Sequence, residues 1–367
     1  MILGLRGFPN VQGGVEKHVE NLAPLVAAQG CDVTVVVRAP YIGQPRLKEW
    51  RGAKLVHVWC PTSKSLEAIV HTFLGVLYAS LKRPDILHIH AVGPAVFVPL
   101  ARIFGLKVVV THHGQDYVRQ KWGMVARAIL RFGECVGMRY SNARISISQN
   151  IRELIRERHG MDSFLIPNGV SIPSVISPGK TLEKFGLIPG KYVLHVSRLV
   201  PEKRHEDLLQ AFQGARLNGW KLAIVGASDH PDEYVRRIIA QIQQTPGAIA
   251  VGFQSGDALG ELYSNAGMFV LPSSHEGLPI ALLEALSYGL PSIASGIPAN
   301  LEVGLPSNCY FPVGNLDALS ACMHALAEAG HGDRNTAECR KRVIEKYDWR
   351  EKASRTVDVY HRVAASV

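Results

Sequence analysis

The sequence predicts an α/β protein of two doubly wound parallel sheets that face each other across a cleft. Short runs rich in β-branched residues alternate with longer amphipathic runs along the whole chain, which is the pattern of buried parallel strands covered by helices. The alternation stops once, in a Pro- and Ser-rich stretch at residues 171–180, and then restarts. A chain of 367 residues is also long enough for two domains, each with its own core.

The first half begins with a short strand that runs into a glycine-rich loop, and a series of strands and helices follows. The expected strands are Asp32–Arg38, Ile86–His90, Lys107–Thr111 and Ala143–Ser148, and the expected helices are Val15–Gln29, Ser65–Leu81 and Trp122–Tyr140. This series forms the first expected domain, residues 1–172.

The second half repeats the pattern. The expected strands are Tyr192–Ser197, Lys221–Val225, Ile249–Val251, Met268–Leu271 and Pro291–Ala294, and the expected helices are Glu206–Ala215, Pro231–Gln244, Ala258–Asn265 and Pro279–Tyr288. The second expected domain spans residues 173–347. Residues 348–367 form one more helix, because Asp348 and Glu351 have capping-box spacing. The sequence leaves open onto which domain this helix packs, the first domain being one choice.

Charge and composition narrow the class of protein. The net charge is +9, and residues 1–172 hold 21 Lys and Arg against 11 Asp and Glu, so the excess lies in the first half. An excess of positive charge on one half of the chain attracts phosphate-rich partners, including anionic lipids and pyrophosphate-linked substrates. The six cysteines lack zinc-ligand spacing, which favours free thiols in the cytoplasm. No apolar run is long enough to span a membrane, so we expect a cytoplasmic or peripherally attached protein.

Loops that follow parallel strands carry the chemistry in this topology, because strand carboxyl ends meet at one edge of a sheet. In the first half, Gly13 and Gly14 open a helix and would let a backbone amide approach an anion, although a tight turn explains them equally well. His112 and His113 follow another strand, where a neutral imidazole can contact a sugar hydroxyl. We expect this role of His113 rather than of His112, which the strand pleat points elsewhere.

The second half has two further loops of this kind. Arg198 and Lys203 follow its first strand and could clamp a diphosphate, or could form a solvated basic turn. Glu276 precedes a helix that Pro279 starts, and its charge could simply favour the helix dipole. Glu284 stands in that helix among leucines, so we expect it to be buried and to need hydrogen-bond donors such as ribose hydroxyls.

Together these motifs resemble the retaining glycosyltransferases of family 4, which have the GT-B fold. The matching segments, in order, are Arg6-Gly7 with Gly13-Gly14-Val15-Glu16, His113-Gly114, Ile166-Pro167-Asn168-Gly169-Val170, Ser197-Arg198 with Pro201-Glu202-Lys203, and Glu276 through Glu284. The resemblance spans nearly the whole chain, and the two glutamates eight positions apart are its most specific element. Residues 111–123 are most similar to members that build bacterial surface polysaccharides.

The resemblance implies a nucleotide-sugar donor bound mainly by the second domain and a glycan or lipid-linked acceptor bound mainly by the first. It assigns the diphosphate to Arg198 and Lys203, the ribose to Glu284, and the donor sugar to Glu276 and His113. The other expected donor contacts are Gly13, Gly14, Gly252, Phe253, Gly277, Leu278 and Pro279, with Gly252 and Phe253 at the usual nucleobase position. The chain has no D-x-D motif, so we expect no metal and no cofactor.

Two other functions remain open at this point. A sugar-nucleotide epimerase of the GT-B fold would share the donor site. A nucleic-acid or membrane-surface binding protein would explain the basic half but not the paired glutamates. Two basic amphipathic segments, Ser65–Arg83 and Arg119–Arg144, also suggest a peripheral contact with an anionic membrane, although such stripes are commonly core packing.

Overall fold

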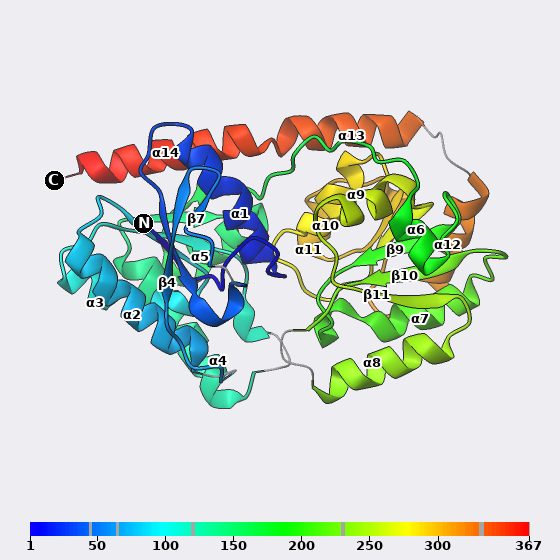
Figure 1. Cartoon of the computed structure of the whole chain (residues 1–367), viewed down its shortest axis with the longest axis horizontal. Helices are drawn as coiled ribbons and strands as arrows, with labels where there is room; N and C mark the ends of the chain where they lie inside the picture. The colour runs from blue at the N-terminus through cyan, green and yellow to red at the C-terminus, as the bar shows by residue number, and fades with distance from the viewer. Residues whose placement is uncertain (44–45, 64–65, 119–121, 229–231, 330–333, 367) are drawn as a thin grey trace. The chain divides into compact units, whose positions relative to one another are not determined.

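The computed structural model describes residues 1–43, 46–63, 66–118, 122–228, 232–329 and 334–366. It divides the chain into two compact units (Figure 1). Unit 1 consists of Met1–Gly169 together with Trp349–Val367, and unit 2 consists of Val170–Asp348. Residues 171–177, which carry much of the predicted linker, have no regular secondary structure.

Unit 1 contains an eight-stranded sheet with the order β3-β4-β2-β1-β5-β6-β7-β8. Its strands are β1 (Ile2–Leu3), β2 (Thr34–Arg38), β3 (Glu49–Trp50), β4 (Ala53–Val58), β5 (Leu87–His90), β6 (Val108–His112), β7 (Ala143–Ser146) and β8 (Phe164–Leu165). All neighbouring pairs are parallel except β3 with β4. The centre of the sheet is buried on both faces, since β5 and β6 have no exposed residue.

Helices cover both faces of this sheet. They are α1 (Gly14–Ala27), α2 (Glu67–Lys82), α3 (Val98–Ile103), α4 (Met124–Tyr140), α5 (Gln149–His159) and α14 (Trp349–Ala365). Figure 1 shows α1 and α14 on one face and α2, α3 and α4 on the other. In the core of the first face, Trp349, Ala353 and Val357 of α14 pack with apolar residues of α1 and β2. The C-terminal helix therefore completes the core of unit 1.

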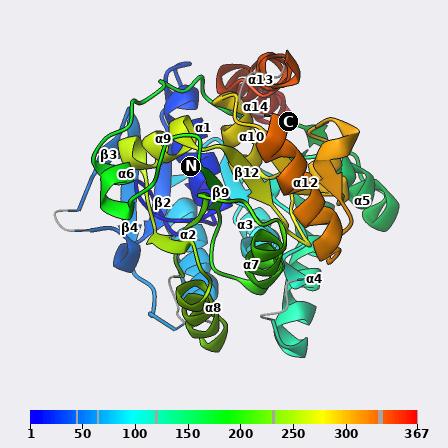
Figure 2. The same ribbon diagram turned by 90° about the vertical axis from the view of Figure 1, so that its right-hand side faces the viewer.

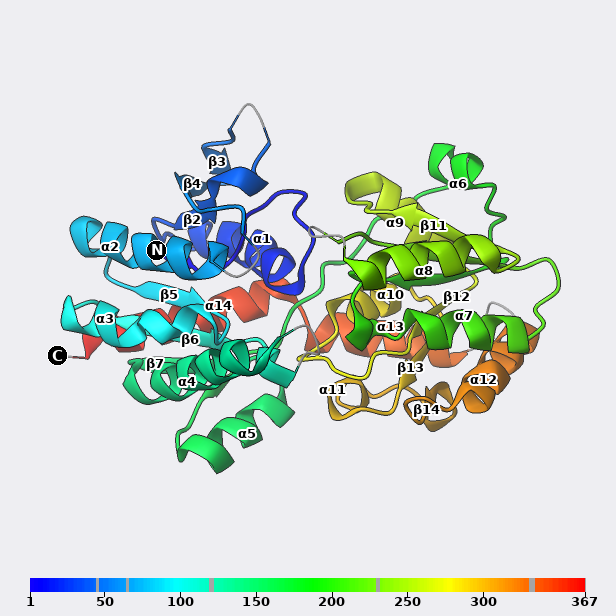
Figure 3. The same ribbon diagram turned by 90° about the horizontal axis from the view of Figure 1, so that it is seen from below.

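Unit 2 contains a six-stranded, fully parallel sheet with the order β11-β10-β9-β12-β13-β14. Its strands are β9 (Tyr192–Val196), β10 (Lys221–Val225), β11 (Ala248–Gly252), β12 (Met268–Leu271), β13 (Ser292–Ser295) and β14 (Tyr310–Phe311). Its helices are α6 (Lys180–Phe185), α7 (His205–Gly214), α8 (Glu233–Gln244), α9 (Gly256–Asn265), α10 (Ile280–Ser287), α11 (Pro298–Leu301), α12 (Leu316–Ala329) and α13 (Arg334–Lys346). In Figures 2 and 3, α7 and α8 lie side by side along the sheet.

The structure confirms the strands and helices expected from the sequence to within two or three residues at each end. The strand expected to reach Ser148 ends at Ser146, because the Ser148 hydroxyl accepts a hydrogen bond from the Ile151 amide and caps α5 (3.3 Å). Ser65, residues 119–121 and Pro231, which belong to predicted segments, lie outside the described residues. In the part of the chain that the structure describes, no helix combines the length and the apolar character needed to cross a membrane.

Several elements were not predicted. β4 has the sequence AKLVHV, and only its first and third residues are buried, so it lacks the continuous apolar run that marks the central strands. β8 and β14 have two residues each, which is too short for any periodicity. The elements missed as well are β3 and the helices α3, α5, α6, α11, α12 and α13. These omissions concern the margins of the sheets and their covering helices rather than the central strands.

Gly169 is packed against the first residue of α14. An added Cβ on Gly169 would overlap the ring of Trp349, which is itself only 4% exposed. We therefore expect Gly169→Ala to lower the free energy of unfolding by about 1–3 kcal/mol, the usual cost of overpacking a core. Thermal denaturation should show a decrease in Tm. The control is Gly123→Ala, whose added Cβ meets no atom within 4 Å, and an unchanged Tm of Gly169→Ala would contradict this packing.

Candidate functional site

In unit 2, an ion pair joins the loops that follow β9 and β12. Lys203 ends the short 3-10 helix Pro201–Lys203 after β9, and its Nζ lies 2.5 Å from Oε1 of Glu276 after β12. The two side chains are only 18% and 11% exposed. Burial raises the pKa of Glu276, but the Lys203 ammonium outweighs it, and the net pKa lies below its usual value. The carboxylate is therefore ionised and holds the ammonium in place.

The two loops are also bound through the backbone. The Ser274 amide donates to the Glu202 carbonyl oxygen (2.9 Å), and the Ser274 hydroxyl donates to the same oxygen (3.2 Å). β9 and β12 are neighbours in the sheet, so their carboxyl ends bring these loops together. The sequence placed Arg198, Lys203 and Glu276 in such loops, and the pairing of Lys203 with Glu276 is what only the structure adds. Arg198 lies in the same loop as Lys203 and is partly buried.

A chain of buried hydrogen bonds lies beneath the β9 loop. His195 Nδ1 donates to the Val270 carbonyl oxygen (2.8 Å), and Ser197 Oγ bridges His195 Nε2 (2.8 Å) and His205 Nε2 (3.0 Å). The chain ends at the Tyr234 hydroxyl, 3.0 Å from His205 Nδ1. Burial lowers the pKa of His195 to about 4 and that of His205 well below its usual value. Both rings are thus neutral at pH 7 and fix the start of the loop that carries Arg198.

These two histidines are not among the residues expected from the sequence. His195 stands in a strand and His205 begins a helix, so each is hidden in a regular element. The available signal was the spacing of His195 and Ser197, which places both side chains on one face of a strand.

The helix α10 begins directly after Pro279, which has an extended backbone. Gly277, Leu278 and Pro279 therefore lie just before the N-terminus of α10, the end of a helix that favours an anion. Leu278 is buried, so it also anchors this turn to the core.

The expectation that Glu284 is buried among leucines is wrong. Leu282, Leu283 and Leu286 are buried, whereas Glu284 is only partly buried. At 100° per residue, these leucines point to other sides of the helix than Glu284. The carboxylate accepts a hydrogen bond from the Tyr263 hydroxyl (3.3 Å), so at least one donor comes from the protein itself.

Two expected nucleobase contacts stand at the same edge of the sheet. Gly252 ends β11, and Phe253 follows it with 37% of its surface exposed. All strands of this sheet are parallel, so both residues share an edge with the β9 and β12 loops.

In unit 1, a buried ion pair braces the glycine-rich loop. Oε1 of Glu16 accepts from the backbone amide of Arg6 (3.1 Å) and from its Nε (3.0 Å), and Nη2 of Arg6 also donates to the Gln12 carbonyl. A Cβ on Gly13 would overlap the Glu16 carboxylate, whereas one on Gly14 would meet no atom within 4 Å. Gly13 is thus required by the protein's own packing, and Gly14 is not.

His112 and His113 point in different directions, as the strand pleat predicts. His112 is fully buried: its Nε2 lies 2.7 Å from Oε1 of Glu134 in α4, and its Nδ1 accepts from the Gly114 amide (3.1 Å). His113 turns the other way, and its Nε2 shares a hydrogen bond with Nδ1 of His90 (2.9 Å). The expectation that His112 points elsewhere than His113 is confirmed.

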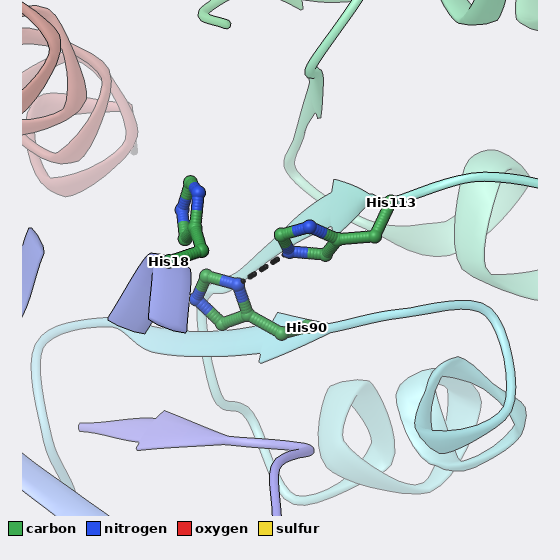
Figure 4. Close-up of side chains that lie close together, drawn as sticks. All are labelled: His18, His90 and His113. Atoms are coloured by element: carbon green, nitrogen blue, oxygen red, sulfur yellow. Dashed lines mark hydrogen bonds between the residues drawn. The ribbon is translucent and has the colours of Figure 1, made fainter. Parts of the chain in front are cut away.

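His113 belongs to a cluster of imidazoles that the sequence did not reveal. His18 from α1, His90 from the end of β5 and His113 after β6 lie together (Figure 4). Burial lowers the pKa of His18 to about 4, and lowers those of His90 and His113 well below their usual values. The one signal in the sequence was His88 and His90, two positions apart in a strand and hence on one face.

Two family models match this chain. The model described as "Glycosyltransferase Family 4" matches residues 12–172, and the model described as "Glycosyl transferases group 1" matches residues 183–336. The first covers the histidine cluster, and the second covers the Lys203–Glu276 pair.

Curated relatives include the phosphatidyl-myo-inositol mannosyltransferase of Mycobacterium leprae, 26% identical over 383 residues that cover 97% of this chain and 95% of that protein. The GDP-mannose:cellobiosyl-diphosphopolyprenol alpha-mannosyltransferase of Xanthomonas campestris is 26% identical over 384 residues, with the same coverage. An uncharacterized glycosyltransferase of Methanocaldococcus jannaschii is 30% identical over 175 residues, which span 46% of this chain and 44% of that protein.

Superposition on solved structures identifies the fold of this chain. The sucrose-phosphate synthase of Thermosynechococcus elongatus superposes with a TM-score of 0.83 at 20% identity, over 100% of this chain and 99% of that chain. HepE of Anabaena in complex with UDP-glucose superposes with a TM-score of 0.77 at 17% identity, over 96% and 97%. The two parallel-sheet units thus form the expected GT-B fold.

The Arg6–Glu16 pair predicts a specific dependence of stability on pH. Burial raises the pKa of Glu16, but Arg6 outweighs it and brings the pKa to about 2, below the reference value of 4.5. The ionised carboxylate therefore stabilises the fold fully above pH 4.5, and this contribution disappears as the pH falls towards 2.

We expect Glu16→Gln to lower the free energy of unfolding at pH 7 by about 3 kcal/mol, since it leaves a buried Arg6 without its charge partner. Thermal denaturation between pH 3 and 7 should show the difference from the unmodified chain shrinking below pH 4.5. The control is Glu20→Gln, which removes only a long ion pair with Lys17 in the same helix (Lys17 Nζ to Glu20 Oε2, 3.7 Å). A difference in Tm that is independent of pH would refute the assignment.

Proposed function

Because this chain belongs to glycosyltransferase family 4 and is a glycosyltransferase, we propose that it transfers a sugar, with retention of anomeric configuration, from a nucleotide-sugar donor to a glycan or lipid-linked glycan. The observation that carries the proposal is the Lys203–Glu276 pair. It lies at the strand edge where a doubly wound sheet binds its ligand, in the loop that leads into the N-terminus of α10.

Unit 2 supplies the donor contacts in this proposal. The Lys203 ammonium uses one N–H for Glu276 and keeps two for phosphate oxygens. As the bond to the sugar breaks, negative charge grows on the diphosphate, and Arg198 and Lys203 stabilise it. Glu276 also contacts the sugar hydroxyls, Glu284 contacts the ribose, and Phe253 with Gly252 contacts the base. The N-terminus of α10, which follows Gly277, Leu278 and Pro279, completes the anion site through the helix dipole.

Unit 1 supplies His113 and the glycine-rich loop. Neutral His113 can donate to or accept from a hydroxyl of the transferred sugar. The open space at Gly14 leaves room for a ligand to approach the backbone at the start of α1. Gly13 shapes the same turn.

For the chemical step we propose front-face substitution. A two-step retaining mechanism needs a free carboxylate nucleophile, whereas Glu276 is already paired with Lys203. The departing phosphate would then accept the proton of the attacking hydroxyl. Since the sequence has no D-x-D motif, cationic side chains and helix amides replace a metal ion, and transfer should persist in EDTA.

The acceptor is proposed to be lipid-linked and to be met at the cytoplasmic face of an anionic membrane, in the synthesis of a cell-surface polysaccharide. The N-terminal part of α4 exposes Met124 (88%), Val125 (74%) and Phe132 (58%) beside the exposed Arg127 and Arg131. The helix α2, which lies on the same side of the sheet as α4 (Figure 1), exposes Phe73 (41%) and Leu81 (82%). Apolar side chains beside cations fit the boundary of an anionic bilayer. The name of the Xanthomonas relative includes a diphosphopolyprenol acceptor.

The proposal is tested by a thermal-shift screen against UDP, GDP, dTDP and ADP and their sugars, because a ligand that binds the folded state raises Tm. HepE was solved with UDP-glucose, and the Xanthomonas relative is named for GDP-mannose, so both donors head the screen. An epimerised sugar nucleotide formed without acceptor would favour an epimerase instead. A salt-dependent shift of nucleic acid without affinity for any donor would favour a binding protein.

We expect Lys203→Ala to lower kcat about 100-fold, which corresponds to about 3 kcal/mol of lost transition-state stabilisation. Steady-state transfer assays with the donor found in the screen measure this. Arg237→Ala removes an ion pair that is half exposed (Nε to Glu206 Oε1, 2.9 Å) and serves as the control, with kcat within about twofold of the unmodified chain. Near-normal turnover of folded Lys203→Ala would exclude its role on the diphosphate.

In flotation assays we expect binding to anionic vesicles but not to zwitterionic vesicles, and weaker binding as salt rises. The double variant Met124→Ser/Phe132→Ser should bind several-fold more weakly, because it removes two of the exposed apolar side chains of α4. Ile188→Ser changes an exposed residue of unit 2 (60%) and is the control. Equal binding to both vesicle types at low salt would reject the membrane contact.

A further inference from the structure

We propose that His18, His90 and His113 form a site in unit 1 for one divalent cation that prefers nitrogen ligands, Zn²⁺ being the natural candidate. One nitrogen atom of each ring can be chosen so that the three lie within 4.8 Å of one another. Figure 4 shows the three rings, which come from three different elements, gathered around a common space. Three imidazoles and one open position make a familiar type of zinc site.

The spacing of two rings already fits an ion. Nδ1 of His90 and Nε2 of His113 are 2.9 Å apart. A tetrahedral zinc ion with Zn–N distances of about 2.0–2.1 Å holds its nitrogens about 3.3 Å apart. The pair therefore needs to open by only a few tenths of an ångström for the ion to replace their shared proton. His18 needs the larger movement, because the set spans up to 4.8 Å.

His90 has a nitrogen that the protein leaves unsatisfied. Its Nε2 is buried, and no hydrogen-bond partner lies within reach among the described residues. This nitrogen is not the one that faces His113, so an ion held through Nδ1 of His90 would leave Nε2 as it is. The ring of His88 packs against that of His90 with centroids 4.1 Å apart, but both nitrogens of His88 are already bonded, to Tyr360 and Thr111. His88 is therefore not a ligand.

The ring of His18 is oriented as a metal ligand is. Its Nδ1 donates to Oδ1 of Asn168 (2.9 Å), which is 2% exposed, so Nε2 keeps its lone pair. A bond from the second ring nitrogen to a carbonyl oxygen is the usual support of a metal-binding histidine. Trp349 packs edge-on against the same ring with centroids 5.2 Å apart. Asn168 of the Asn-Gly motif and Trp349 of the C-terminal helix thus both fix the orientation of the His18 ring.

The chemistry of the site selects the ion. An all-nitrogen set does not suit Mg²⁺ or Ca²⁺, which prefer oxygen ligands. His113 is only partly buried, so the fourth position can be reached by water.

One consequence rests on the proposed function. If His113 contacts the transferred sugar, an ion bound to its ring removes it from that task. Zinc at this site would therefore inhibit transfer, and a chelator would restore it. This behaviour is opposite to that of an enzyme that needs a metal on the diphosphate.

The binding itself is tested without any assay of activity. The full chain is freed of metal with a chelator and titrated with Zn²⁺ in competition with a chromophoric chelator, and then with Co²⁺, whose visible spectrum reports four-coordinate geometry. We expect one ion per chain and, by X-ray absorption of the zinc-loaded chain, three imidazole ligands. His18→Gln and His90→Gln should each weaken binding at least 100-fold. The exposed His324, paired with Glu328 (3.3 Å), provides the control variant His324→Gln, with unchanged affinity.

The results of these experiments distinguish the proposed zinc site from the proposed role of His113 in sugar transfer. Affinity equal to that of the unmodified chain in folded His18→Gln and His90→Gln, or fewer than three imidazoles around zinc, overturns the site. The absorption measurement uses the unmodified chain, so it decides the matter even where a variant fails to fold. Zinc held by three imidazoles without any effect on transfer supports the site and contradicts the role of His113 in catalysis.

Discussion

Parallel pairing of neighbouring strands is the constraint on which both units depend, because it brings the carboxyl ends of all central strands to one edge of each sheet. In unit 2 this pairing places the loop after β9 beside the loop after β12. Lys203 and Glu276, 73 residues apart in the sequence, meet there at 2.5 Å. In unit 1 the same rule brings His90, at the end of β5, beside His113, just after the neighbouring β6. The strand order of each sheet therefore decides which of these side chains become neighbours.

Both strand edges rest on buried polar side chains that are paired or kept neutral. Arg6 and Glu16 neutralise each other beneath the glycine-rich loop, and His195 and His205 stay uncharged beneath the basic loop. An unpaired charge in these places would cost several kcal/mol. The loops are therefore positioned by hydrogen bonds that no solvent competes for, and positioning of this kind is what electrostatic stabilisation of a developing charge requires.

Unit 1 is assembled from two distant segments of the chain. The helix α14 lies beside α1, and Trp349 contacts both the His18 ring and the position of Gly169. The segment Asn168-Gly169 thus serves two purposes. The side-chain amide of Asn168 orients the ring of His18, and Gly169 leaves room for the indole of Trp349. This arrangement connects the C-terminal helix to the imidazole cluster, although more than 300 residues separate Trp349 from His18.

The sequence by itself determined the fold class, the two-part organisation and the loops that carry Arg198, Lys203, Glu276 and His113, because hydrophobic periodicity and glycine or proline positions are local signals. Local patterns failed at short or edge strands such as β4 and at Glu284, where helix geometry separates a residue from its sequence neighbours. Only the tertiary structure decided the partners: Glu276 for Lys203, Arg6 for Glu16, and His18 with His90 for His113. These pairs depend on which strands and helices become neighbours, and that is settled by packing between segments far apart in the chain.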